Sequence, residues 1–121
     1  MRTEIAFGLF TDGCTSLFCQ TAHGAAFLGQ NWDWTEEQKP NLLLLTLHRP
    51  QLPTIKIVTE AGIIGKIGLN SAGVGVCFNA IRAKGVDAAR IPAHLGLRRV
   101  LECGSVGEAV EVLEEAGVAS S

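Results

Sequence analysis

The sequence lacks the features that mark nucleic-acid-binding, membrane and secreted proteins. Only 18% of its residues are charged, the net charge is -2, and Arg98-Arg99 is the one adjacent basic pair. A nucleic-acid partner is not expected, because phosphate binding needs a stripe of basic residues. Apolar runs such as Leu42 to Leu45 are far shorter than the roughly 18 residues of a membrane span. The first residues show no basic segment followed by an apolar one, so we expect an intracellular protein with no membrane partner.

The sequence also lacks the cysteine pattern of a secreted, disulfide-bonded protein, and its four cysteines are Cys14, Cys19, Cys77 and Cys103. Without a secretory signal they are expected to be free thiols rather than a disulfide framework. We predict that Cys19, Cys77 and Cys103 are buried, because free cysteine commonly packs as a small apolar side chain. Cys14 and Cys19 fall on opposite faces of a predicted strand, and no second Cys or His pair has zinc spacing. No metal site is therefore expected.

The composition is that of one packed domain, because 47% of the residues are hydrophobic. The sequence shows no linker and no repeat. Short apolar and β-branched segments alternate with turn residues as far as Cys77, and the pattern becomes helical from Pro92. This order predicts an α+β fold in which mostly antiparallel hairpins precede two helices. The predicted strands are residues 4–10, 14–21, 25–32, 42–48, 54–59, 63–69 and 74–79.

Two helices are predicted to pack on the sheet. The first covers residues 92–102, has proline in its first turn, and is expected to bury Leu95, Leu97, Val100 and Leu101. The second begins at Ser105-Val106-Gly107-Glu108, which has the pattern of a capping box, and Gly117 ends it. The expected buried face of this second helix holds Val106, Ala109, Val110 and Leu113.

The first segment that suggests chemistry is Asp12-Gly13-Cys14-Thr15-Ser16. Cleavage between Gly13 and Cys14 would leave a residue with both a thiol and a free α-amine. That amine, with a reference pKa of roughly 7.7 to 8, accepts the thiol proton near neutral pH. The alternative is an ordinary cysteine in a hairpin after an Asp-Gly turn.

Two further segments hold candidate partners of Cys14. In Gln30-Asn31-Trp32-Asp33-Trp34, a hairpin would return Asp33 to Cys14, and strand alternation puts Asn31 and Asp33 on one face. The alternative is a polar strand end with Trp32 and Trp34 packed in a core. Asn79 ends a glycine-interrupted strand and is a candidate donor to an oxyanion. An isolated asparagine at such a position more often caps a strand or turn, and that is the alternative for Asn79.

These segments resemble the acyl-coenzyme A:6-aminopenicillanic acid acyltransferase family of cysteine-type N-terminal nucleophile hydrolases. The resemblance runs through nearly the whole chain. Its most specific stretches are Asp12-Gly13-Cys14-Thr15, Gly29-Gln30-Asn31-Trp32-Asp33, Leu52-Pro53-Thr54-Ile55-Lys56, Thr59-Glu60-Ala61-Gly62-Ile63-Ile64-Gly65-Lys66 and Asn70-Ser71-Ala72-Gly73-Val74.

The resemblance implies an αββα sandwich, self-cleavage before Cys14, and acyl transfer or amide hydrolysis through a thioester on that cysteine. It implies that Asp33 orients the amine and that Gln30 and Asn31 contact substrate. More distantly, the segments are similar to bile salt hydrolases and penicillin V acylases, in which an arginine matches Gln30 and an asparagine near Asn79 lines the oxyanion hole. The partners implied are a small-molecule acyl donor and an amine acceptor. Coenzyme A enters as a thioester substrate, and no cofactor is expected.

Members of this family are much longer than 121 residues, so we expect residues 1–121 to form a single partial domain. Residues 1–13 match the end of the pro-segment, or α-subunit, and residues 14–121 match the start of the β-subunit. The expected further partners are therefore the missing N- and C-terminal parts of the same protein. For a full-length fungal relative, the resemblance implies a peroxisomal location.

Three alternatives remain open at this stage. The chain is either the acyl-transferring enzyme or an inactive remnant that serves only in association, for which an exposed apolar face predicts a homodimer. A papain-like thiol enzyme would pair Cys14 with His23, His48 or His94, although none lies in a motif of that class. Residues 62–67 only superficially match a phosphate-binding loop, and a hairpin turn is expected there.

Overall fold

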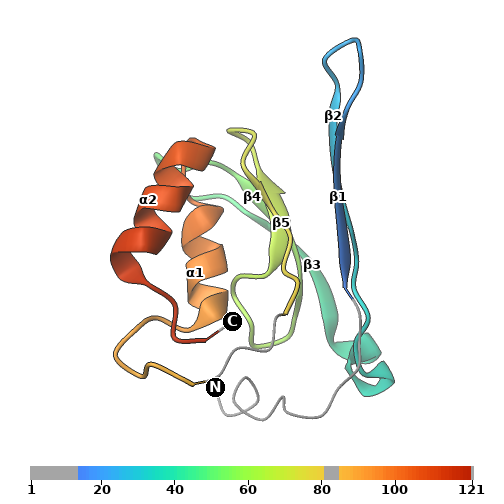
Figure 1. Cartoon of the computed structure of the whole chain (residues 1–121). Helices are drawn as coiled ribbons and strands as arrows, with labels where there is room; N and C mark the ends of the chain where they lie inside the picture. The colour runs from blue at the N-terminus through green and yellow to red at the C-terminus, as the bar shows by residue number, and fades with distance from the viewer. Residues whose placement is uncertain (1–13, 81–84, 121) are drawn as a thin grey trace.

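The computed structural model describes residues 14–80 and 85–120. In this part of the chain, two antiparallel sheets are followed by two helices (Figure 1). In chain order the elements are β1 (Thr15–Gln20), β2 (Ala26–Asn31), the short 3-10 helix η2 (Glu36–Asn41), β3 (Leu42–Leu47), β4 (Ile55–Glu60), β5 (Ile67–Asn70), β6 (Gly75–Val76), α1 (Ala93–Val100) and α2 (Val106–Ala116). The predicted α+β class and the antiparallel pairing are confirmed. The predicted strand at residues 4–10 lies outside the described residues.

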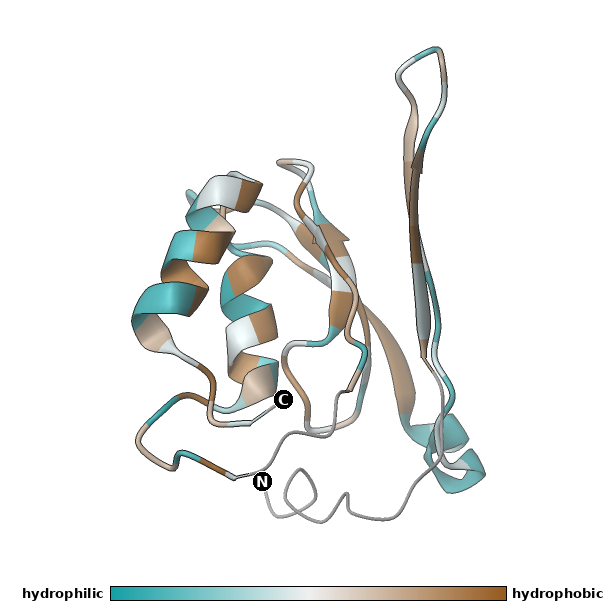
Figure 2. Ribbon diagram, viewed as in Figure 1, coloured by the Kyte–Doolittle hydropathy of each residue, from teal (hydrophilic) through white to brown (hydrophobic). Residues whose placement is uncertain are grey.

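The first two strands form a long hairpin. Its register runs from Thr15 opposite Asn31 to Gln20 opposite Ala26, and Gly24 closes the turn with a φ of 85°, a conformation that favours glycine. Apolar side chains are exposed on both faces of the hairpin: Leu17 is 63% exposed and Phe18 is 66% exposed. Figure 2 shows this apolar character as brown along the hairpin. The hairpin therefore adds little to the core that the described residues form.

The other four strands form a meander in the order β3-β4-β5-β6. Burial alternates along β4: Ile55 and Ile57 are buried, whereas Lys56 and Val58 are exposed. Such alternation is expected when one face of a sheet packs against other elements. The helices cover this buried face, and the hairpin stands on the other side of the sheet (Figure 1). Three layers result, namely helices, meander and hairpin.

The loop between β4 and β5 is a tight turn in which Gly62 has a φ of 91°. A turn, rather than a phosphate loop, was expected there, and this is confirmed. The predicted strand at residues 63–69 is too long, because β5 begins only at Ile67. The intervening residues leave the sheet to contact α1, where a Cβ on Gly65 would overlap His94 O and Arg98 N. Arg98 Nη1 also donates to Ile64 O over 3.1 Å. Close approach to the helix therefore shortens the strand.

Both helices form where the sequence predicts them. The capping box of α2 is present, since Ser105 Oγ accepts from Glu108 N at 3.2 Å. Glu108 Oε2 in turn accepts from Gly104 N at 2.7 Å, one residue before the N-cap, so the side chain ties the preceding loop to the start of the helix. Gly117, with a φ of 60°, ends the helix and donates its N–H to Leu113 O at 2.9 Å.

The predicted buried faces of the helices are partly wrong. Leu95, Val106 and Val110 are 39%, 64% and 49% exposed. The predicted burial of Val100, Leu101 and Ala109 is confirmed, and Val112 and Leu113 pack beside them partly buried. The contact between α2 and α1 lies at Gly96, which is so close to Leu113 and Val118 that a Cβ there would meet both. Val106 and Val110 lie outside this contact and are exposed.

One buried asparagine joins the meander to the helices. Asn70 is 3% exposed, and its Nδ2 donates to Leu101 O at 3.0 Å and to Cys103 O at 2.7 Å. Its Oδ1 accepts from Ala72 N at 2.9 Å and Val74 N at 3.0 Å. All the hydrogen-bonding capacity of the side chain is directed at backbone, which fixes the β5–β6 turn against the end of α1.

All four cysteines are free thiols, as predicted. Only Cys103 is buried, whereas Cys77 is partly exposed and Cys19 is exposed. The prediction of burial for Cys19 is wrong because it lies on β1, whose side chains are exposed on both faces of the hairpin. Within the described residues, neither helix has the length and apolar character needed to cross a membrane.

Candidate active site

The structure brings Cys14 and Asn79 together although they lie far apart in the sequence. Asn79 Nδ2 donates to the Cys14 carbonyl oxygen at 3.0 Å. The other end of the same side chain, Oδ1, accepts from Ser16 Oγ at 2.8 Å. Cys14 and Asn79 are both partly exposed. The amide is thus held against the first residues of the hairpin. Its NH₂ group has two N–H donors, and the bond to Cys14 uses one of them.

Gln30 holds the segment that carries Asn79. Its Nε2 donates to Phe78 O at 2.6 Å, and its Oε1 accepts from Phe78 N at 2.8 Å. The glutamine amide therefore pairs with the Phe78 backbone as a neighbouring strand would. Since β6 ends at Val76, the side chain replaces a strand partner that the meander does not supply. The Phe78 ring meets the His94 ring of α1 edge-on, with centroids 5.4 Å apart.

Asn31 and Asp33, the other residues predicted for the site, are exposed. Thr15 pairs with Asn31, so continuing the register by one residue places Trp32 opposite Cys14. Gly13, and with it the predicted cleavage point, lies outside the described residues. The hairpin expected between Cys14 and the Asp33 segment is present, and the role of Asp33 stays a prediction.

A buried ion pair lies beside this end of the hairpin. Lys66 Nζ is 2.6 Å and 2.7 Å from the two carboxylate oxygens of Glu60, and both residues are 5% exposed. The ammonium also lies over the Trp32 ring, 3.7 Å from its centroid, and 5.7 Å from the centroid of Trp34. Contacts of this kind are cation–π interactions.

Burial lowers the pKa of Lys66, because desolvation disfavours the ammonium, and the hydrogen bond and charge of Glu60 oppose that shift. Negative charge at Cys14 also favours the charged form of Lys66. The ion pair was not singled out from the sequence. Both of its residues belong to the stretch Thr59-Glu60-Ala61-Gly62-Ile63-Ile64-Gly65-Lys66, but nothing local indicates that they meet Trp32.

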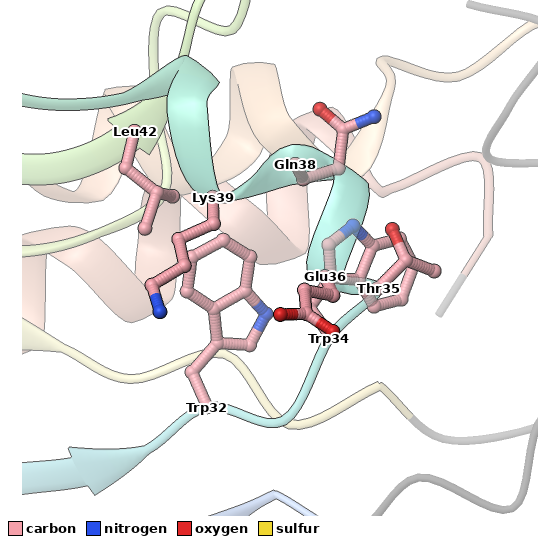
Figure 3. A pocket seen from close by; sticks show the side chains of 7 residues that line it. All are labelled: Trp32, Trp34, Thr35, Glu36, Gln38, Lys39 and Leu42. Carbon is pink, nitrogen blue, oxygen red and sulfur yellow. The ribbon is translucent and has the colours of Figure 1, made fainter.

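Two hollows lie near these residues. One, of about 170 Å³, is lined by Trp32, Trp34, Lys39 and residues of η2, which Figure 3 shows around the two indole rings. The other, of about 290 Å³, separates the hairpin from the outer face of the meander and is mostly apolar. Gln30 and Cys77 lie on its wall, and burial raises the pKa of the Cys77 thiol.

The three histidines lie in different surroundings. His23 lies in the β1–β2 turn, at the end of the hairpin away from Cys14 (Figure 1). His48 Nδ1 is 3.1 Å from Thr54 Oγ1 in the β3–β4 connection, and His94 packs against Phe78. Across residues 14–80 and 85–120, no group of three His, Cys, Asp or Glu side chains is arranged to hold a metal ion. Among the described residues, Cys14 accepts a hydrogen bond from the Asn79 amide. It lies opposite Trp32 in the continued register, and it interacts electrostatically with Lys66.

Comparison with known proteins places the chain in a family of acyltransferases. Residues 19–121 match the family described as Acyl-coenzyme A:6-aminopenicillanic acid acyl-transferase, and the chain belongs to this family. It is 50% identical over 123 residues to the acyl-coenzyme A:6-aminopenicillanic-acid-acyltransferase 40 kDa form of Emericella nidulans. The alignment covers 99% of this chain and 34% of that relative. The chain thus spans about a third of the length of the curated relative that it matches. The family predicted from the motifs is confirmed.

Proposed function

We propose that the full-length protein transfers an acyl group through a thioester on Cys14, after its own chain is cut between Gly13 and Cys14. The observation that carries this proposal is the Asn79 amide, whose Nδ2 lies 3.0 Å from the Cys14 carbonyl oxygen. Cys14 stands at the start of the hairpin, in a segment whose sequence suggests a nucleophile that is released by chain cleavage. Family membership supports an acyl-coenzyme A as donor and a β-lactam amine as acceptor.

The proposed reaction has two displacements. The Cys14 sulfur attacks the acyl carbon of the donor thioester, the carbon–sulfur bond to coenzyme A breaks, and the coenzyme A thiol leaves with the proton from Cys14. The acceptor amine then attacks the new thioester, an amide forms, and the thiol of Cys14 is restored. Water in place of the amine gives hydrolysis. The α-amine freed by chain cleavage relays the proton, because its reference pKa lies at about 8.

Asn79 and Asp33 have separate proposed roles. Asn79 Nδ2 donates to the oxyanion that forms at the acyl carbon, and loss of such a donor costs about 2.7 to 4 kcal/mol of barrier. Asp33, which follows Trp32 on the strand end opposite Cys14, orients the α-amine of the cut chain. Asn31, exposed on the same strand end, contacts substrate. Gln30 acts through Phe78, and so positions Asn79.

The three layers support a further part of the proposal, namely that this chain forms one part of an αββα sandwich. The helices cover one face of the meander, and the hairpin on the other side begins a second sheet. The remaining parts of the protein would pack on the exposed apolar residues of the hairpin and close the groove of about 290 Å³.

The test is intact-mass measurement on the full-length protein incubated with an acyl-coenzyme A. We expect two pieces that separate at Gly13, and an acyl adduct on the piece that begins with Cys14. Cys14→Ala is expected to give a single, inactive chain. Cys19→Ala is the matched control, because Cys19 is an exposed thiol on β1, the strand that follows Cys14, and it is expected to cleave and react normally. An uncut chain with full activity would refute the proposal.

A second candidate function is association without catalysis. The observation that favours it is the exposed apolar surface of the hairpin, where Leu17, Phe18 and Phe27 are 63%, 66% and 58% exposed. Exposed apolar patches of this kind mark interaction sites. Acyl transfer by the purified protein would rule out a purely associative role.

A further inference from the structure

We propose that Lys66 is a positioning residue for Cys14: its ammonium, seated on Trp32 and held by Glu60, supports negative charge on the Cys14 sulfur and fixes the strand end that faces it. This role rests on the proposed function, in which Cys14 is the nucleophile. It adds a cation that is separate from the residues proposed to act on substrate.

The geometry that carries the proposal is a chain of contacts from α1 to Cys14. Gly65 lies so close to α1 that any side chain there would strike the helix backbone. This contact fixes the adjacent Lys66, whose Nζ lies 3.7 Å from the centroid of the Trp32 ring. Trp32 follows Asn31, the partner of Thr15, and therefore lies opposite Cys14. The Lys66 ammonium thus contacts Trp32, the residue that lies opposite the proposed nucleophile Cys14.

Glu60 is what keeps the ammonium in this place. An unpaired lysine that is 5% exposed would give up its proton rather than remain charged in the interior. Both carboxylate oxygens of Glu60 lie within 2.7 Å of Nζ and oppose this loss. Burial remains the largest influence and lowers the pKa of Lys66, and negative charge at Cys14 adds to Glu60 in opposing that shift.

A purely structural ion pair would account for the burial and the short contacts, so the test must report on Cys14 itself. Site-resolved alkylation of the whole chain with iodoacetamide at pH 7, read by peptide mass spectrometry, gives a rate for each cysteine. Exposed Cys19 is the internal reference, since only the thiolate reacts. Buried Cys103, which is 3% exposed, reports unfolding by becoming reactive.

The variants are Lys66→Met, which removes the charge and keeps most of the length, and Lys66→Arg, which keeps the charge. With Cys103 still protected, we expect Lys66→Met to lower the Cys14 to Cys19 rate ratio about three- to tenfold, because one nearby positive charge is lost. Lys66→Arg should recover most of it. An unchanged ratio in folded Lys66→Met would overturn the proposal.

If Lys66→Met exposes Cys103, the comparison moves to Trp32→Leu, which keeps the ion pair and removes the ring on which the ammonium sits. A ratio equal to that of the unmodified chain would then overturn the proposal, and a fall would support it. Alkylation requires neither chain cleavage nor acyl transfer. Failure here therefore differs from failure of the proposed function, which is seen as activity that survives Cys14→Ala.

Discussion

Replacing Gln30 tests how the candidate site is held together. The two hydrogen bonds between its amide and the Phe78 backbone, at 2.6 Å and 2.8 Å, join the hairpin to the segment that carries Asn79. Gln30→Ala removes both bonds. Each contributes about 0.5 to 1.5 kcal/mol net, so the segment should loosen by about 1 to 3 kcal/mol.

Hydrogen exchange at the Phe78 amide measures this loosening directly. Because about 1.4 kcal/mol corresponds to a factor of ten, exchange should accelerate about 5- to 150-fold in Gln30→Ala. Gln30→Glu should show a comparable or larger effect, since a carboxylate oxygen would face Phe78 O without a proton between them. In the full-length protein, acyl transfer should fall in parallel, because Asn79 loses its fixed place against Cys14.

The control is Gln20→Ala, an exposed glutamine at the other end of the same hairpin, for which neither exchange at Phe78 nor activity should change. The reasoning would be refuted by a Gln30→Ala protein in which the Phe78 amide exchanges as slowly as before. Slow exchange with lost activity would mean instead that Gln30 contacts substrate directly.

Two further changes test the fold around the site. Asn70→Ala removes four hydrogen bonds from a side chain that is 3% exposed, and should lower the free energy of unfolding by about 3 to 5 kcal/mol; a loss below about 1 kcal/mol in urea denaturation would contradict this account. Phe18→Ser should weaken self-association of the 121-residue chain in sedimentation experiments, because the Phe18 ring is 66% exposed on the hairpin. Val106→Ser is the comparison, because Val106 on α2 is 64% exposed. An equal effect of both changes would indicate general apolar contact rather than association through the hairpin.

The features that were predicted correctly depend on neighbours in the sequence. The turn at Gly62 needs a residue that tolerates positive φ, and the start of α2 needs Ser105 and Glu108 three residues apart, so both appear in the pattern of residues. The α+β order and the hairpin between Cys14 and Trp32 follow from short apolar segments with turns between them.

The errors arise where contacts are distant in the sequence. Periodicity assigned Val106 and Val110 to the buried face of α2, but both are exposed, and α2 contacts Gly96 of α1 through Leu113. The strand predicted from residue 63 begins only at Ile67, because Gly65 belongs to the helix contact rather than to the sheet. Strand and helix periods define which residues share a face, not which face is covered.

By itself, the sequence determined the fold class, the family and the identity of the candidate nucleophile, because these depend on local pattern and on motif order. Only the tertiary structure decided that Asn79 reaches Cys14, that Gln30 holds Phe78 in place, and that Lys66 and Glu60 form a buried pair against Trp32. Apart from Lys66 with Glu60, these contacts join residues more than thirty positions apart. Such pairs meet only after the hairpin, meander and helices have packed, and no local preference of the chain encodes them.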